Sequence, residues 1–300
     1  MGAKLRVVRR RIRSVQSTMK ITSAMELIAA SRIVKAQQRV IEARPYADLL
    51  TQAMEDVARQ TGSIVHPLLE EREAPARAGV LVMTSDRGLA GAFNANLLKR
   101  AEDLLRRVRS RGIEPVLYLI GRKAISYFRF RGVAPEASWS GFSEVPRYAA
   151  AEEIGERLIE EFGSGGIDEL HTVYTDFRSA FTFRATDKRF LPIAPEEVAA
   201  KGPGVPHPEY IFEPEPAQIL DDLLPQYVIT KVYFALLESA ASENAARQRA
   251  MAAATDNAEE LIKVLTRQAN RARQDEITTE IMEIVGGAEA LAQASGGAGG

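Results

Sequence analysis

The chain has 300 residues, of which 46% are hydrophobic and 26% charged, and its 39 basic and 40 acidic residues leave a net charge of −1. This composition is that of a globular protein with room for one or two cores, and no apolar run reaches the roughly 18 residues that a membrane-spanning helix needs. The chain has no cysteine, which excludes disulfides, thiolate metal sites and cysteine nucleophiles and fits a reducing compartment. Its three histidines are not spaced as metal ligands.

The first predicted element is a long helix at about residues 3–58. Alternate steps of three and four separate its first apolar residues, Leu5, Val8, Ile12, Val15 and Met19. This spacing is the seam of a coiled coil. Further along, we expect a neighbouring row to become the apolar face: Ile21, Met25 and Ile28. Pro45 is expected to kink or interrupt the helix, because it lacks the backbone donor and crowds the preceding turn.

The start of this helix is strongly basic, with seven Lys or Arg residues between positions 4 and 20 and no acid before Glu26. Such a segment has three interpretations: a transit peptide, a nucleic-acid-binding arm, or one half of a coiled coil with an acidic partner. A transit peptide is not expected to continue as one helix deep into the chain. A nucleic-acid-binding arm usually includes aromatic side chains, and residues 1–40 have none. A binder of phosphates alone stays open as a less favoured alternative.

Residues 76–205 are predicted to form a central Rossmann-like α/β domain. Short apolar runs at 78–85 and 115–121 alternate with helical stretches, and the last part of the domain is rich in β-formers. Strands that alternate with helices imply a largely parallel sheet. Residues 206–216 are proline-rich and are predicted to be an irregular linker.

The segment TSDRGLAGAFN at 84–94 follows a predicted strand and opens a helix, which is where nucleotide-binding folds place a phosphate loop. Its glycines, Gly88 and Gly91, match neither the dinucleotide fingerprint nor the P-loop. We interpret the segment as a tight turn with Asp86 and Arg87 exposed. No set of nucleophile, base and orienting group is evident elsewhere, so the sequence predicts no catalytic residue, no metal, no cofactor and no small-molecule substrate.

The last predicted helix covers residues 217–291, and a disordered tail is expected at 292–300. Its alanine-rich stretch at 238–260 suits a close helix contact, a smooth surface, or simply a stable helix, and composition does not separate these. Heptad-like steps follow in two stretches with a change of phase between them: Ala258, Leu261, Leu265, Gln268 and Ala272, then Ile277, Ile281, Ile284, Ala288 and Leu291.

Residues 275–291 contain five acids and no base. If the terminal helices pair antiparallel, the basic residues at 5–20 would lie beside this acidic stretch, and the opposite charges would set the register. The predicted fold is therefore an α/β domain plus a long antiparallel coiled coil that forms a shaft. Its expected pairing residues are Leu5, Val8, Ile12 and Val15 on one helix and Ile277, Ile281 and Ile284 on the other.

Three stretches resemble one known family, the gamma subunits of F-type ATP synthases. They are the opening helix RRRIRSVQSTMKITSAMELIAASR, the turn TSDRGLAGAFN, and the C-terminal stretch that begins ASENAARQRA. The C-terminal stretch ends in the family signature Ile277-Thr278-x-Glu280-x-x-Glu283-x-x-x-Gly287-Ala288. The resemblance covers nearly the whole length, and Ala90 stands where the family commonly has cysteine.

The resemblance implies a non-catalytic rotor that couples c-ring rotation to the beta catalytic sites. The terminal helices would form the shaft inside three alpha and three beta subunits, and the central domain would bind epsilon and the membrane c-ring. Residues implied to contact the beta subunits are Met25, Arg273, Gln274 and Thr278. Tyr210 and Glu213 are implied to lie near the c-ring.

The variants of the family also differ in ways that bear on location. Without cysteine, the chain lacks the regulatory switch of the chloroplast form, and the opening helix begins almost at Met1, whereas a mitochondrial precursor would carry a presequence. A bacterial protein is therefore expected, peripheral to the inner or plasma membrane on its cytoplasmic side. The competing hypothesis is a free-standing coiled-coil scaffold or a basic nucleic-acid-binding protein. Co-purification with alpha, beta and epsilon, without nucleic acid, would separate the two.

Overall fold

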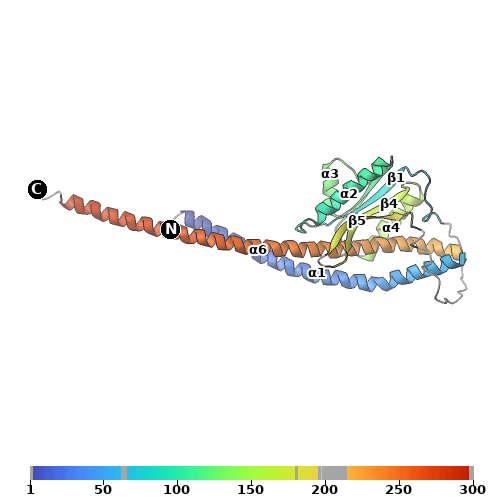
Figure 1. Cartoon of the computed structure of the whole chain (residues 1–300), viewed down its shortest axis with the longest axis horizontal. Coiled ribbons are helices and arrows are strands. Elements are labelled where there is room, and N and C mark those ends of the chain that lie inside the picture. Colours follow the sequence, from blue (N-terminus) through green and yellow to red (C-terminus); the bar gives the residue numbers. More distant parts are fainter. Residues whose placement is uncertain (1–2, 62–65, 180–181, 195–196, 198–214, 297–300) are drawn as a thin grey trace. The chain divides into compact units, whose positions relative to one another are not determined.

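The computed structural model of the chain describes residues 3–61, 66–179, 182–194, 197 and 215–296. Two compact parts are distinguished: a terminal part made of residues 1–27 and 250–300, and a central part made of residues 28–249. Two long helices, α1 (Ala3–Thr61) and α6 (Pro216–Gly296), contribute to both parts (Figure 1). Together, α1 and α6 are called the helix pair below.

The central part contains a five-stranded sheet in the order β3-β2-β1-β4-β5. Its strands are β1 (Arg77–Met83), β2 (Glu114–Ile120), β3 (Ala137–Trp139), β4 (Glu169–Phe177) and β5 (Phe183–Leu191). The first four are parallel, while β5 returns antiparallel to β4. The predicted α/β fold with a largely parallel sheet is confirmed, because short apolar runs between turn residues form its buried strands.

Helices cover both faces of this sheet. The helices α2 (Phe93–Ser110) and α3 (Arg122–Phe130) pack on one face, around Val80, Val82 and Leu119. The opposite face, with Leu81 and Tyr118, packs on α4 (Tyr148–Gly163) and on the first turns of α6. Successive residues of a strand point to opposite faces, so each buried strand supplies both cores.

The turn between β2 and α3 requires a glycine. Gly121 has φ +91°, and a Cβ at this position would lie 2.2 Å from the carbonyl oxygen of Thr84. Only glycine allows both the backbone conformation and this close approach. The Thr84 hydroxyl donates a hydrogen bond to the carbonyl of Ile120 (3.0 Å) and accepts one from the amide of Ala124 (2.9 Å). The carboxyl ends of β1 and β2 are thereby fixed together.

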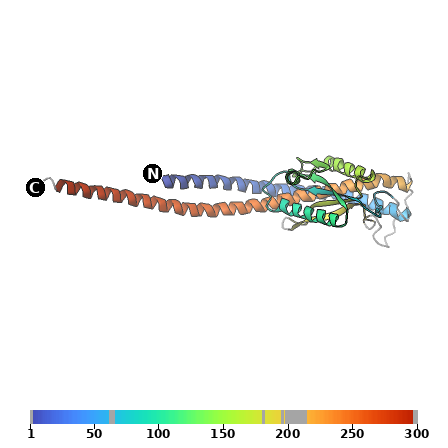
Figure 2. The same ribbon diagram turned by 90° about the horizontal axis from the view of Figure 1, so that it is seen from above.

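Within the central part, residues 28–61 of α1 run antiparallel to residues 216–249 of α6 (Figures 1 and 2). Pro45 lies inside α1 without ending it, so of the two expected effects, a kink or an interruption, the interruption does not occur. The helix is held on both sides of the proline by buried residues such as Ala36 and Leu50, so packing offsets the lost backbone hydrogen bond. Pro225 likewise lies inside α6.

The ends of the long helices differ slightly from the prediction. The helix α1 reaches Thr61, and α6 continues to Gly296, so residues 292–296 of the predicted disordered tail are helical. The alanines and leucine before Gly296 favour helix, which accounts for the extension. Residues 206–214 of the predicted linker lie outside the described residues.

Candidate functional site

In the terminal part, the start of α1 and the second half of α6 run antiparallel, and the burial of their side chains marks the seam between them. On α1, Leu5 is only 3% exposed, and the expected seam residues Val8, Ile12 and Val15 are half-buried. On α6, Leu265 is 2% exposed. The hydroxyls of Thr22 and Thr255 meet across the seam at 2.8 Å. These features confirm the coiled-coil seam predicted for the start of α1.

The register of this pair differs from the prediction. Counting equal numbers of residues in opposite directions from the Thr22–Thr255 contact places Leu5 level with Ala272. The charge pattern predicted a partner near Leu291, which is roughly 19 residues, or about 28 Å, further along the axis. From Asp275 onward, α6 therefore continues past the start of α1 (Figures 1 and 2). Seam packing determines this register, since exposed charge pairs contribute little energy.

The assignment of several residues to the seam was therefore wrong. Ile277, Ile281 and Ile284 were expected to pack on α1, but they are exposed by 46%, 54% and 71%. On α6, the inward residues are Ala258, Ile262, Leu265, Ala269 and Ala272, while Leu261 and Gln268 point outward. On α1, Ile21 and Ile28 are exposed, because the original steps continue through Thr22 to Ala29 instead of moving to the neighbouring row. The inward residues of α6 follow regular steps of four and three up to Ala272, and the predicted change of phase after Ala272 falls where α6 leaves the seam.

The residues implied to contact the beta subunits do not form one cluster. Arg273, Gln274 and Thr278 are exposed near the free end of α6, and the Thr278 hydroxyl donates to the carbonyl of Gln274 (3.0 Å). Met25 is half-buried and level with residue 252 of α6. It therefore lies about 32 Å along the axis from Arg273. Tyr210 and Glu213, implied to lie near the c-ring, are outside the described residues.

The carboxyl edge of the sheet, where Rossmann-like folds bind ligands, carries a cavity of about 570 Å³. The carboxylate of Asp86 points to the start of α3 and accepts hydrogen bonds from three backbone amides. The donors are Arg122 (3.2 Å), Gly141 (2.8 Å) and Ser143 (3.1 Å). A helix N-terminus of this kind is where a nucleotide phosphate would bind. Asp86 is thus half-buried and structural, where the sequence suggested an exposed residue.

Beside this edge lies a group of charged side chains that sequence reasoning missed, called the Glu144 cluster below. Its members are Arg32, Arg87, Glu144, Glu243 and Arg247. Glu144, in the loop between β3 and α4, forms ion pairs with Arg32 of α1 and with Arg247 of α6 (3.4 Å). The exposed Arg87 approaches the same carboxylate at 3.6 Å.

Arg247 is the most enclosed cation of the Glu144 cluster, with 5% of its surface exposed. It donates to the carboxylate of Glu243 (2.6 Å), the side-chain oxygen of Asn244 (3.2 Å) and the carbonyl of Gly88 (3.4 Å). Burial raises the pKa of Glu243, and the charge of Arg247 opposes that shift. Two charges spaced four residues apart on an alanine-rich, buried helix face were the only sequence signal for this cluster.

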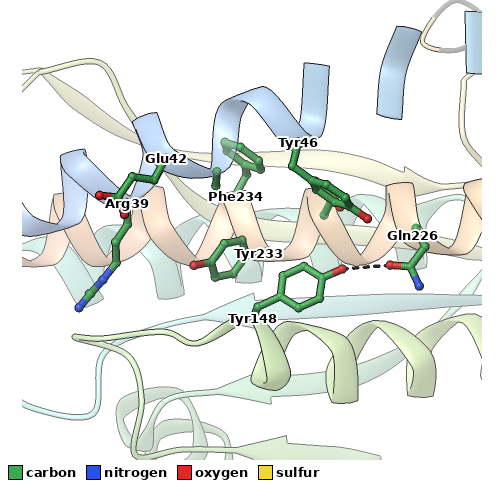
Figure 3. Close-up of a pocket in the computed structure, with 9 residues that line it drawn as sticks. Arg39, Glu42, Tyr46, Tyr148, Gln226, Tyr233 and Phe234 are labelled. Carbon is green, nitrogen blue, oxygen red and sulfur yellow. Dashed lines mark hydrogen bonds between the residues drawn. The ribbon is translucent and has the colours of Figure 1, made fainter. Parts of the chain in front are cut away.

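A cavity of about 530 Å³ lies elsewhere in the central part, between α1, α4 and α6 (Figure 3). Its lining is Arg39, Glu42, Ala43, Tyr46, Tyr148, Gln226, Thr230, Tyr233 and Phe234. The hydroxyl of Tyr148 donates to the side-chain oxygen of Gln226 (3.0 Å), and its ring meets that of Tyr233 edge to face at 5.4 Å. These contacts tie α4 to α6.

Among the described residues, no group of three or more His, Asp or Glu side chains is placed to hold a metal ion. Within the same residues, no helix is long and apolar enough to cross a bilayer.

An antiparallel helix pair joined to a Rossmann-like domain is a fold that this chain shares with chains of solved ATP synthases. The fold is shared by a chain of the Euglena gracilis mitochondrial ATP synthase (OSCP/F1/c-ring, rotational state 3), with TM-score 0.65 and 17% identity over 97% of this chain and 95% of that one. A chain from the Tetrahymena thermophila mitochondrial ATP synthase central stalk and c-ring aligns with TM-score 0.57 and 22% identity, over 78% and 99%.

The sequence comparisons assign the family. The ATP synthase family model matches residues 4–291. The ATP synthase gamma chain of Acidothermus cellulolyticus is 56% identical over 97% of this chain and 98% of that protein. That of Thermobifida fusca is 54% identical over 99% of both. The chain belongs to the ATP synthase gamma-chain family and is a subunit of the ATP synthase complex.

Proposed function

We propose that this chain is the turning shaft of a bacterial ATP synthase, coupling rotation of a c-ring to the conformational cycle of the beta catalytic sites. The partners are three alpha and three beta subunits, which surround the shaft, and epsilon and the c-ring, which turn with it. Proton flow turns the ring, and the helix pair, being asymmetric, presents a different side to each beta subunit in turn.

This proposal rests on one observation: the end of α6 that extends past the start of α1 is exposed. There, within the described part of the chain, no other helix lies level with α6, yet α6 exposes large apolar side chains: Ile277, Ile281, Met282, Ile284 and Val285. A single helix of this kind is marginal in water, and exposed apolar surface usually marks a protein contact. A surrounding ring of alpha and beta subunits would supply the missing contacts.

The proposal also covers the residues that contact the beta subunits and the c-ring. Arg273, Gln274 and Thr278 contact beta-subunit loops near the tip of α6, and Met25 contacts a beta subunit at a separate level about 32 Å lower. Tyr210 and Glu213 approach the c-ring. Residues 1–58 and 217–291 act as the shaft, and residues 76–205 act as the domain that binds epsilon and the c-ring.

The chain carries no catalytic site of its own in this proposal. The edge of the sheet that could hold a nucleotide is occupied by the carboxylate of Asp86, which would repel a phosphate. ATP chemistry therefore takes place on the surrounding subunits. The chain works at the cytoplasmic face of the plasma membrane, reached through its partner subunits.

A reversible crosslink tests rotation directly. Because the chain has no cysteine, Leu89→Cys introduces its only thiol, on a 62%-exposed side chain of the 84–94 turn. Asp86 is less suitable, since its carboxylate holds three backbone amides. A disulfide to a facing thiol on an alpha or beta subunit should stop multi-turnover ATP hydrolysis, and reductant should restore it.

The matched control is a disulfide from the same thiol to epsilon, which turns with the shaft and should leave hydrolysis intact. Sustained hydrolysis by complexes that are fully crosslinked to alpha or beta would exclude rotation. That result would instead support a stationary scaffold.

A further inference from the structure

We propose that the Glu144 cluster holds the helix pair against turning relative to the sheet, so that part of the torque between the central domain and the shaft passes through the carboxylate of Glu144. This inference rests on the proposed rotor function and concerns the contact between the central domain and the helix pair, through which torque would pass. Glu144 is a positioning residue, because it acts on the helices and touches no reacting group.

The geometry joins three elements at one side chain. Glu144 lies on the loop that follows β3, and its carboxylate meets Arg32 of α1 on one oxygen and Arg247 of α6 on the other, at 3.4 Å. Only 14% of the Glu144 side chain is exposed. Because each helix has its own ion pair to this side chain, turning either helix away from the loop lengthens a charge-assisted contact.

The loop that carries Glu144 is itself fixed to the sheet. Asp86, at the end of β1, accepts hydrogen bonds from the amides of Gly141 (2.8 Å) and Ser143 (3.1 Å), and its own amide donates to the Ser143 hydroxyl (2.9 Å). A continuous path of short polar contacts therefore leads from the sheet through the loop to both helices. The 84–94 turn, which fits no nucleotide motif, forms part of this path.

Arg247 is held from several directions. Its guanidinium bonds Glu243 (2.6 Å) and Asn244 (3.2 Å) on its own helix and the carbonyl of Gly88 (3.4 Å) in the 84–94 turn. With 5% exposure, it has little freedom to swing away when Glu144 pulls on it. The planar, forked donors of arginine suit such multiple fixation better than a lysine would.

Packing alone is poorly suited to resist rotation at this level of the helix. Apart from Glu243 and Asn244, the buried residues of α6 just before Arg247 are small: Ala240, Ala241, Ser242, Ala245 and Ala246. Small side chains allow close approach but interlock weakly, so a directional contact is needed to prevent slipping. Buried ion pairs often add geometric specificity more than net stability, which is the property required here.

The test uses the complete complex of alpha, beta, gamma and epsilon, immobilised through its alpha and beta subunits. A rotation probe is attached to one of two engineered thiols: Arg109→Cys on α2, which reports the central domain, or Lys35→Cys on α1, which reports the helix pair. Both positions are exposed. The angular fluctuation of the probe during catalytic pauses measures torsional stiffness at each position.

Each thiol is combined with Glu144→Gln, Glu144→Asp or the control Glu156→Gln, which removes an exposed carboxylate on α4. With Glu144→Gln, the angular variance at the Arg109→Cys probe should rise about two-fold or more, because Arg32 and Arg247 lose a buried partner. The variance at Lys35→Cys should stay unchanged. Glu144→Asp, which keeps the charge, should restore part of the stiffness, and Glu156→Gln should have no effect.

The outcomes separate the two levels of the proposal. Equal broadening at both probes would mean that the whole shaft had loosened in its bearing, and unchanged variance at both would mean that the contact carries no load; either result overturns the role of Glu144 and leaves rotation intact. A wild-type complex whose probes do not turn on adding ATP would overturn the rotor function and this inference with it.

Discussion

Glu238 is a single residue on α6 whose charge state depends on its neighbours in the fold. Burial and the nearby charge of Asp176 raise the pKa of its carboxyl from 4.5 to about 7, while Lys188 and Arg44 act in the opposite direction. Between pH 4.5 and about pH 7, Glu238 holds a proton in the folded chain that it has released in the unfolded chain. The contribution of Glu238 to stability is therefore full below about pH 4.5 and is lost as the pH rises to about 7.

The variant Glu238→Gln tests this linkage, because its neutral amide resembles the protonated acid. In the purified full-length chain, we expect its urea midpoint to match that of the parent at pH 5 and to exceed it at pH 8. Glu156→Gln, on an exposed side chain of α4, serves as the control and should shift neither midpoint. An equal effect of Glu238→Gln at both pH values would contradict the raised pKa.

At the scale of elements, α4 and α6 pack so closely that a glycine is required. A Cβ on Gly155 would lie 2.7 Å from Cγ1 and 3.2 Å from Cα of Ile229. In an ordinary helix interior, replacing glycine by alanine stabilises by roughly 0.5–1 kcal/mol. Here overpacking against the α6 backbone is expected to reverse the sign, at about 1–3 kcal/mol.

The comparison of Gly155→Ala with Gly163→Ala tests that reversal within one helix. Gly163 ends α4, and nothing lies within 4 Å of the position of its added Cβ. We expect Gly155→Ala to lower the urea midpoint of the full-length chain and Gly163→Ala to leave it the same or raise it slightly. Equal midpoints for the two variants would show that α4 can move away from Ile229 at little cost.

The secondary structure and the fold were predictable from the sequence, because they depend on local patterns. Runs such as AGVLVM, bounded by turn residues, form buried strands, and the steps from Leu5 to Met19 locate the seam of α1. Helix starts and ends were missed by only a few residues. The single helix predicted at about 3–58 does run through Pro45, and only the expected interruption was wrong, because tertiary packing on both sides of the proline outweighs its local preference.

The register of the helix pair and the Glu144 cluster were not predictable from the sequence. Opposite charge attracts over many registers, so the basic and acidic ends of the chain could not fix which residues meet. On α6, both Leu261 and Ile262 offer an apolar seam, and burial selects Ile262. Arg32, Glu144 and Arg247 come together only because the fold brings distant segments to one place, and no local motif marks them.

At the scale of the whole molecule, the corrected register changes the role of the charged ends. The basic residues near the start of α1 lie level with residues 257–272, and the acidic stretch from Asp275 lies at or beyond the start of α1. The two blocks are therefore presented outward at different levels, where they suit partner subunits better than each other. Hydration and salt weaken such contacts, so both blocks are suited to surfaces that slide past each other.

The stability of the helix pair should decrease toward its free end in the isolated chain. Up to Ala272, α6 has a partner helix and buries side chains such as Leu265; beyond it, Ile281 and Ile284 are exposed. A helix segment with no apolar contact is marginal in water, while segments in a packed core open only with the domain. Hydrogen exchange followed by mass spectrometry should therefore be slowest in the sheet, faster along residues 250–272, and close to that of an unfolded peptide beyond residue 275.

Two substitutions make that gradient a sharp test. Leu265→Ser removes a buried seam residue and should accelerate exchange in both α6 and the start of α1 in the isolated chain. Ile281→Ser changes an exposed residue of the same class and should have no effect there. In the assembled complex, where partner subunits cover the tip, residues beyond 275 should become protected, and Ile281→Ser should then weaken that protection. Strong protection of the tip in the isolated chain would show that α6 is stabilised by a contact within the chain and would remove the main support for a surrounding ring.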